Sequence, residues 1–321
     1  MNDFKILAAT PEHTEGIVAL LQSSLGESST PKSLAYWQWK HEQNVFGKSY
    51  TFVAIQNNTI VGVRALMQWQ WTKGTEQLKT VRAVDTATHP AYQGKGIFKA
   101  LTLHAMHYCS NQNIQLVYNT PNQKSMPGYL KMGWQKANTL PVNIKWPFTK
   151  PALYEPQKVL NLLHDYAFGL QMPQFKFHQN NTTDPIGWHT ALSLPYLQWR
   201  FANCPVVPYG LLAQNGLFGF VFSIKPRQLW QELRICTAWC LPGAEHLAQK
   251  ALYKLCTQVR PAFVSFAQSV YTPPMNQLIP GIGVPFIKGP QVTLKSLSAN
   301  IPDGWSNYTL WQPSLGDMEL F

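Results

Sequence analysis

The chain has 321 residues, of which 45% are hydrophobic, enough apolar surface for a folded core, so a disordered protein is excluded. Only 13% are charged, with 26 Lys and Arg against 15 Asp and Glu, and the net charge is +11. The basic residues are scattered rather than clustered in a stripe, which disfavours a nucleic-acid partner. At roughly 100 to 200 residues per domain, this length indicates two domains.

The compartment is predicted from the N-terminus and the cysteines. Residues 1–10 contain a four-residue apolar run, whereas a signal peptide needs about 7 to 15 apolar residues. The longest uncharged stretches are interrupted by Pro, Asn, Gln and Gly, and a membrane span needs about 20 mainly apolar residues. The five cysteines form no Cys-x-x-Cys pair. We therefore expect a cytoplasmic protein with reduced thiols, no membrane contact and no metal.

Helices and strands alternate in residues 1–150, which indicates an α/β sheet. Prolines at 141, 147, 151 and 156 predict a linker or a crossing strand after these elements and a domain boundary near residue 150. The predicted elements are a helix from Thr10 to about Ser24, a hairpin over residues 50–68, a strand from Leu78 to Thr88, a helix from Ile97 to Cys109, a strand from Ile114 to Tyr118 and a helical segment from Lys124 to Lys131.

A short element occurs twice in the chain. Leu34–Lys40 recurs as Leu194–Arg200, an offset of 160 with four of seven residues identical. An apolar hairpin signal follows each copy, at residues 50–62 and 208–219. Two hairpins could resemble each other by chance, but the shared Tyr-x-Gln-Trp-basic element favours a duplication. We predict tandem domains at residues 1–150 and 151–321.

A glycine loop joins the strand ending at Thr88 to the helix starting at Ile97. Gly94 and Gly96 allow successive backbone N–H groups to point into one concavity, and the helix N-terminus adds partial positive charge. Such a loop is suited to a pyrophosphate. The dinucleotide fingerprint is not met because position 99 is Lys, and no Gly-Lys-Ser/Thr of a P-loop is present.

The loop resembles the Gln/Arg-x-x-Gly-x-Gly/Ala signature of the GNAT superfamily of N-acetyltransferases, with Gln93 and Gly96 in place. Residues 129–134 are similar to the family's Tyr-x-x-x-Gly-Phe, and Asn122 lies where relatives often have a polar residue facing the cofactor. Phe98 departs from the pattern, since relatives have a small residue there. The resemblance covers most of residues 4–145. It implies a layered α/β (α+β) fold of two tandem GNAT-like domains, each with a mixed, mostly antiparallel sheet flanked by helices.

The resemblance also implies a reaction. Acetyl-CoA or another acyl-CoA would be the co-substrate, without a metal, and a neutral amine would attack the thioester in a ternary complex. Tyr129, a phenol with a reference pKa of about 10, would donate its proton to the departing thiolate. The residues implied for the cofactor are Thr86, Ala87, Thr88, Gln93, Gly94, Lys95, Gly96, Ile97, Phe98, Lys99 and Asn122.

Two carboxylates are candidates for the general base. Arg82 occupies a strand position where some relatives carry a catalytic Glu. Asp85 is the nearest carboxylate in sequence, but strand alternation puts it on the face opposite Thr86. The terminal carboxylate of Phe321 is a second candidate, because some tandem relatives fold their C-terminus into the active site. The alternative for this tail is a frayed terminus.

The second half is predicted to be a degenerate GNAT-like copy that is structural and helps to form the acceptor site. Leu233–Trp239 takes the place of the cofactor strand, but the shorter, acidic Leu241–His246 replaces the glycine loop. We expect an N-acyltransferase acting on a primary amine of a small molecule, such as an amino sugar or amino acid derivative, as a monomer or homodimer. The alternatives are a non-catalytic CoA-binding or sensing module, or a paired-domain relative that transfers amino acids from charged tRNA.

Overall fold

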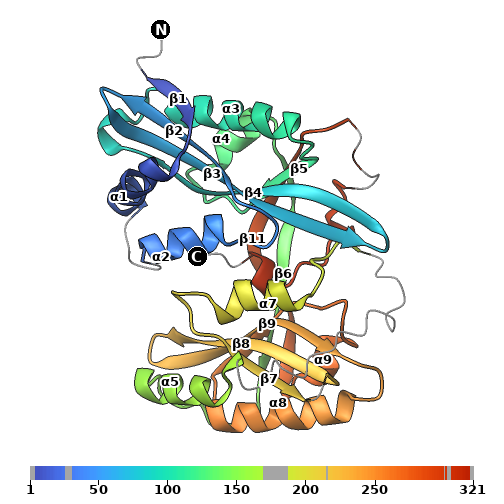
Figure 1. Cartoon of the computed structure of the whole chain (residues 1–321). Coiled ribbons are helices and arrows are strands. Elements are labelled where there is room, and N and C mark those ends of the chain that lie inside the picture. Colours follow the sequence, from blue (N-terminus) through green and yellow to red (C-terminus); the bar gives the residue numbers. More distant parts are fainter. Residues whose placement is uncertain are drawn as a thin grey trace.

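The strands of the protein form one continuous mixed sheet (Figure 1). The computed structural model describes residues 4–25, 31–168, 187–214, 216–299, 301 and 305–318. Neighbouring strands are antiparallel except for β4 with β5 and β9 with β10, which are parallel. In spatial order the eleven strands of this sheet are β1 (Lys5–Ala8), β2 (Tyr50–Gln56), β3 (Thr59–Lys73), β4 (Glu76–Thr88), β5 (Leu116–Asn119), β11 (Ile282–Ser296), β6 (Gln135–Trp146), β10 (Phe263–Phe266), β9 (Trp230–Cys240), β8 (Phe218–Arg227) and β7 (Gly210–Gln214).

Helices cover both faces of the sheet in the first half. α1 (Thr14–Leu25) follows a 3₁₀ turn, η1 (Pro11–His13), and buries Ile17, Leu20 and Leu21 against Val63 and its neighbours. α3 (Ile97–Asn111) buries Ile97, Leu101 and Ala105 against the opposite face, which carries Phe52 and Leu66. Residues alternate between the two faces along a strand, and apolar residues line both faces here. The predicted mostly antiparallel sheet flanked by helices is thus confirmed.

The two halves of the chain exchange strands at the centre of the sheet. β6 runs from the first half into the second, where it pairs with β10. β11 returns from the second half and lies between β5 and β6, antiparallel to both. The proline-containing stretch after residue 140 is therefore the crossing strand, with β6 continuing to Trp146. In place of two separate sheets, one sheet runs through both halves, and the division at residue 150 remains a proposal.

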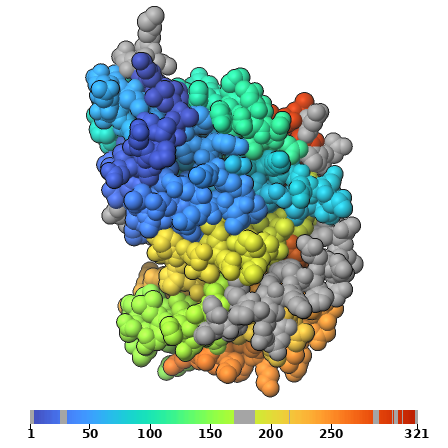
Figure 2. Space-filling view, in the orientation of Figure 1, coloured from blue at the N-terminus to red at the C-terminus, as the bar shows by residue number. Residues whose placement is uncertain are grey.

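The repeated sequence element adopts the same local structure in both copies. The hydroxyls of Ser33 and Ser193 each accept a hydrogen bond from the third backbone N–H that follows. Trp39 Nε1 donates to the carbonyl of Trp199 at 2.5 Å, and Trp199 Nε1 donates to that of Trp39 at 2.8 Å. These reciprocal bonds form a local two-fold contact between the halves, where α7 lies against α2 (Figures 1 and 2). The elements are α2 (Leu34–Trp37) with a π-helical turn, η2 (Gln38–Glu42), and α7 (Leu194–Leu197) with another, η5 (Gln198–Ala202).

The second half follows the order of the first. β7, β8 and β9 are succeeded by α8 (Glu245–Val259) and the parallel strand β10, as β2, β3 and β4 are by α3 and β5. We retain the GNAT-like copy as a proposal. In the described part of the chain, no helix has the length and apolar character needed to cross a membrane. The remaining elements are η3 (Pro90–Tyr92), α4 (Met126–Lys131), α5 (Pro156–Asp165), α9 (Met275–Leu278), η6 (Tyr308–Leu310) and α10 (Leu315–Met318).

Candidate active site

A β-bulge lies in β4 at the candidate site. Arg64 on β3 pairs with Thr86, and the next residue, Ala65, pairs with Val84, so Asp85 is the extra residue, with φ of 38°. β4 pairs with β5 only from Thr80 to Arg82. Beyond that point the two parallel strands separate and leave room for a ligand beside the last residues of β4.

The glycine loop lies next to this opening. Gly94 and Gly96 have φ of 78° and 79°, a left-handed conformation that favours glycine. Apart from the adjoining residues, no described part of the chain lies within 4 Å of where a Cβ would be. Gly96 is the N-cap of α3 and makes no side-chain cap. The first N–H groups of the helix lack intrahelical acceptors, so this terminus is suited to an anion.

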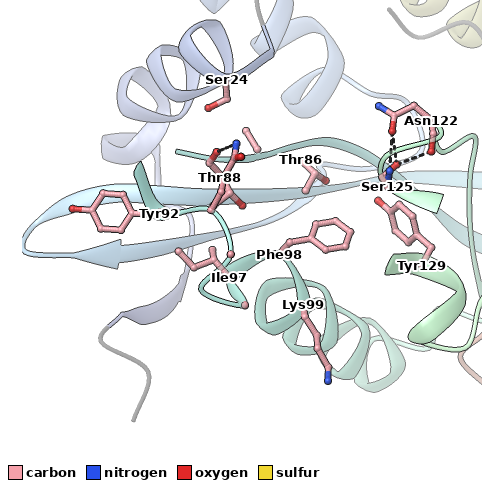
Figure 3. Close-up of a pocket in the computed structure, with 14 residues that line it drawn as sticks. Ser24, Thr86, Thr88, Tyr92, Ile97, Phe98, Lys99, Asn122, Ser125 and Tyr129 are labelled. Atoms are coloured by element: carbon pink, nitrogen blue, oxygen red, sulfur yellow. Dashed lines mark hydrogen bonds between the residues drawn. The ribbon is translucent and has the colours of Figure 1, made fainter. Parts of the chain in front are cut away.

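A pocket of about 510 Å³ joins the glycine loop to Tyr129 (Figure 3). It brings together Tyr129 and every residue implied for the cofactor except Lys95. Ser24, Tyr92 and Ser125 were not anticipated; Tyr92 adjoins the loop motif, whereas the end of α1 reaches the pocket only through the fold. The pocket is lined by Ser24, Thr86, Ala87, Thr88, Tyr92, Gln93, Gly94, Gly96, Ile97, Phe98, Lys99, Asn122, Ser125 and Tyr129.

Tyr129 is held firmly at the inner part of the pocket. Its side chain is buried, and its hydroxyl oxygen accepts a hydrogen bond from Arg64 Nη1 at 2.6 Å. Phe98 packs edge-on against the ring with centroids 5.4 Å apart, and Trp134 lies at 5.3 Å. Phe98, the departure from the family pattern, therefore supports the Tyr129 ring. Sequence reasoning missed Arg64, although a charged residue inside the apolar run of residues 60–67 was a signal of an unusual site.

The remaining polar residues shape the rim. Asn122 Oδ1 accepts hydrogen bonds from the backbone N–H and the hydroxyl of Ser125, which secures the start of α4. Lys99 extends away from the row formed by Thr86, Phe98 and Tyr129 (Figure 3). The ammonium of Lys95 lies 4.7 Å from the Tyr92 ring centroid. Both lysines add positive charge near the glycine loop. No group of three or more His, Cys, Asp or Glu among the described residues could hold a metal ion.

The structure argues against Asp85 as the general base. Its carboxylate contacts Lys40 Nζ at 2.5 Å and His41 Nε2 at 3.0 Å, both from η2 on the face away from the pocket. Burial disfavours the charged carboxylate, but Lys40 and the hydrogen bond from His41 outweigh burial and hold the pKa of Asp85 far below its usual range. Asp85 is not among the residues that line the pocket. This carboxylate is paired with Lys40 and His41 rather than with a group in the pocket.

Arg82 organises the C-terminal segment instead of supplying a base. Its guanidinium is buried and donates to the backbone oxygens of Asp317 at 3.1 Å and Met318 at 2.8 Å. It also donates to the Thr120 hydroxyl at 3.2 Å. α10 is thereby fixed between the two halves of the chain. Phe321, the other candidate base, lies outside the described residues.

Comparisons with known proteins agree with this geometry. Residues 5–137 match the sequence model of a family described as an acetyltransferase (GNAT) domain. This segment contains β1 to β5, the glycine loop and Tyr129. Residues 5–137 therefore form a GNAT acetyltransferase domain. A search of curated protein sequences found no significant match.

Solved structures resemble the whole fold. A probable N-acyltransferase from Enterococcus faecalis V583 is 11% identical, with 92% of this chain and 73% of that chain covered and a TM-score of 0.64. A GCN5-related N-acetyltransferase from Anabaena variabilis is 15% identical over the same shares, with a TM-score of 0.59. Eis1 from Mycobacterium abscessus is 9% identical over the same shares, with a TM-score of 0.54. At these identities the likeness concerns the fold alone.

Proposed function

We propose that the protein transfers an acyl group, most simply acetyl, from CoA to a primary amine of a small molecule such as an amino sugar or an amino acid derivative. The observation that carries this proposal is the single pocket that joins an uncapped, glycine-lined helix terminus to a buried tyrosine. One end of the pocket suits a pyrophosphate, and the other suits the chemistry at a thioester.

The pocket suits the parts of an acyl-CoA in order. The pyrophosphate would accept hydrogen bonds from the backbone N–H groups of residues 94–99, and the pantetheine would lie along Thr86–Thr88 where β4 and β5 separate. Residues 1–150 carry 15 Lys and Arg against 7 Asp and Glu, so the field around this pocket also favours an anionic ligand.

Tyr129 would act as the general acid. The amine nitrogen attacks the thioester carbonyl carbon, the C–S bond breaks, and Tyr129 donates its hydroxyl proton to the leaving sulfur. Holding both reactants in one complex supplies much of the acceleration by positioning alone. The buried ring, packed against Phe98 and Trp134, keeps the hydroxyl in one place for this transfer.

The general base in this proposal is the terminal carboxylate of Phe321. Its support is the anchoring of α10, because Arg82 fixes the backbone at Met318 and three further residues can extend about 10 Å. Deleting residues 319–321 is then expected to abolish turnover and to leave CoA affinity unchanged. Unchanged turnover would remove the terminal carboxylate from the mechanism. Residues 151–321 would otherwise serve to complete the sheet and shape the acceptor pocket.

The test of the proposed function is thiol release from acetyl-CoA in the presence of a library of amines, with mass spectrometry of the products. Tyr129→Phe is expected to lower kcat by about 10²- to 10³-fold while calorimetry finds CoA affinity unchanged. Tyr253→Phe is the matched control, since Tyr253 is half exposed on α8 in the other half of the chain. CoA binding without thiol release for any amine would instead support a sensing module.

A further inference from the structure

Arg64 is an unusually placed charged residue in this domain. It lies on β3 with an exposure of 0%, and its Nη1 donates to Thr86 Oγ1 at 2.5 Å and to the Tyr129 hydroxyl oxygen at 2.6 Å. Its Nε and Nη2 have no hydrogen-bond partner among the described residues. No Asp or Glu in the described ranges forms an ion pair with it. Within the described ranges, the buried guanidinium thus has two neutral oxygens as its acceptors.

Such a cation is costly in the resting protein. A buried charge is normally paired with an opposite charge, and leaving it unpaired lowers stability. The contacts of Arg64 with aromatic rings compensate only in part: its guanidinium carbon lies 5.2 Å from the Tyr129 ring centroid and 5.7 Å from that of Phe98. Both rings and Thr86 line the pocket. The cation therefore sits directly behind the wall on which the proposed chemistry takes place.

The direction of the Arg64–Tyr129 hydrogen bond determines where the Tyr129 proton lies. Guanidinium groups only donate, so the Tyr129 oxygen is the acceptor in this contact. The hydroxyl hydrogen must then be directed away from Arg64. Because Tyr129 lines the pocket, this arrangement leaves its hydrogen available to a ligand there.

Other ionisable groups near Tyr129 have different roles. Burial raises the pKa of the Cys109 thiol on α3 to about 12, so that this thiol is neutral near pH 7. Lys295 on β11 lies over Trp134, and its ammonium donates to the backbone oxygen of Met132. Among the residues that the structure describes, Arg64 is accordingly the cation in direct contact with the Tyr129 oxygen.

We propose that Arg64 is a positioning residue for acyl transfer, which holds the Tyr129 oxygen as a hydrogen-bond acceptor and stabilises negative charge on it. When the Tyr129 O–H bond breaks and an S–H bond forms, the negative charge of the thiolate moves to the phenolic oxygen, 2.6 Å from Arg64 Nη1. A preorganised charge at that point lowers the energy of the transition state. This inference rests on the proposed function, in which Tyr129 is the general acid.

A double-mutant cycle tests whether Arg64 acts through Tyr129. Arg64→Met is expected to lower kcat by about 10- to 100-fold with the KM for acetyl-CoA within about twofold of wild type. In the Tyr129→Phe background the same change should cost no further activity, because the group on which Arg64 acts is gone. Arg64→Lys keeps the charge and should recover part of kcat. The rate can be measured for thiol release in the presence of an amine, or for the slow hydrolysis of acetyl-CoA in its absence.

Stability separates this role from a merely structural one. Replacing an arginine that is merely structural would lower the stability of the protein. Replacing an uncompensated cation by a neutral side chain should instead leave the melting temperature unchanged or raise it. Arg234→Met is the control, because Arg234 is paired with buried Glu232 in the second half. We expect Arg234→Met to lower the melting temperature. Any fold-loss of kcat that it causes should multiply with the fold-loss caused by Tyr129→Phe.

Each outcome decides the matter. If the kcat losses of Arg64→Met and Tyr129→Phe multiply, or if kcat falls only with the folded fraction, Arg64 is structural and this inference is wrong while the acid role stands. If Arg64→Met is as fast as wild type and Tyr129→Phe is slow, the inference alone is overturned. If Tyr129→Phe has the wild-type rate, both the acid role of Tyr129 and the role of Arg64 are wrong. Should Arg64→Met not fold, Arg64→Gln replaces it in the same cycle.

Discussion

Replacing Asp85 by Asn is expected to weaken folding and to leave the chemistry intact. Asp85 has φ of 38°, and Asn tolerates this left-handed conformation about as well as Asp does. The substitution therefore changes the charge without straining the bulge in β4. What it removes is the carboxylate that faces Lys40 and His41.

The expected loss of folding stability follows from the burial of Lys40, the partner of Asp85. The side chains of Lys40 and Asp85 are 3% and 8% exposed, with Nζ and Oδ2 2.5 Å apart. Removing one partner of a buried ion pair costs about 3–5 kcal/mol, because the other charge stays buried and unpaired. That is a large part of a typical unfolding free energy of about 5–15 kcal/mol. Lys40→Met combined with Asp85→Asn should recover much of it, which a coupling energy from the cycle would quantify.

The assay is urea unfolding of the four proteins in the cycle, with kcat measured at a temperature where each is folded. Asp85→Asn should lower the urea midpoint and leave both kcat and the shape of its pH profile unchanged. Near-wild-type stability together with lost turnover would refute this reasoning and restore Asp85 as the base.

The same pair predicts how stability responds to acid. The pKa of Asp85 is lowered in the folded protein by Lys40 and His41 against the opposing effect of burial. Its contribution is therefore complete above the ordinary Asp pKa of about 4 and is lost as the pH falls below that value towards the folded one. The stability difference between wild type and Asp85→Asn should shrink over that acidic range.

Three further outcomes are expected. Gly96→Ala and Gly243→Ala introduce similar backbone strain at φ of 79° and 87°, about 1–2 kcal/mol each. Only Gly96→Ala should weaken CoA binding in calorimetry. Equal CoA affinity in both variants would mean that the loop before α3 does not hold the ligand. Burial lowers the pKa of Lys225 to about 8, so the unfolded chain binds more protons than the folded one between pH 8 and about 10.5. Lys225→Met should therefore stabilise the protein by about 1–3 kcal/mol at pH 7. A gain in stability that did not shrink by pH 10 would contradict this effect of burial. Trp199→Phe leaves the buried carbonyl of Trp39 without the donor from the Trp199 indole and should lower the free energy of unfolding by about 1–3 kcal/mol. Trp39→Phe should lower it by about as much, and clearly unequal losses would argue against a symmetric contact.

Motifs and spacing in the sequence predict the parts of the site that depend on neighbouring residues. Gly94 and Gly96 permit the left-handed turn, the apolar spacing after them produces α3, and Tyr129 lies on a helix that starts a few residues after Asn122. Backbone conformation over such short stretches is decided by local sterics and periodicity, so motif and spacing were sufficient. The repeated Tyr-x-Gln-Trp-basic element likewise predicted two similar local structures.

The contacts between groups that are distant in sequence come from the fold. Asp85 finds Lys40 across 45 positions of the sequence, and Arg82 binds the backbone at Asp317 and Met318 across more than 200. β11 enters between β5 and β6, which turns two expected sheets into one. Such contacts depend on strand order and on the face each side chain takes, and a single bulge or exchanged strand changes both. For the same reason, Arg64 was recognisable in the sequence as an oddity, but its contact with Tyr129 came from the fold.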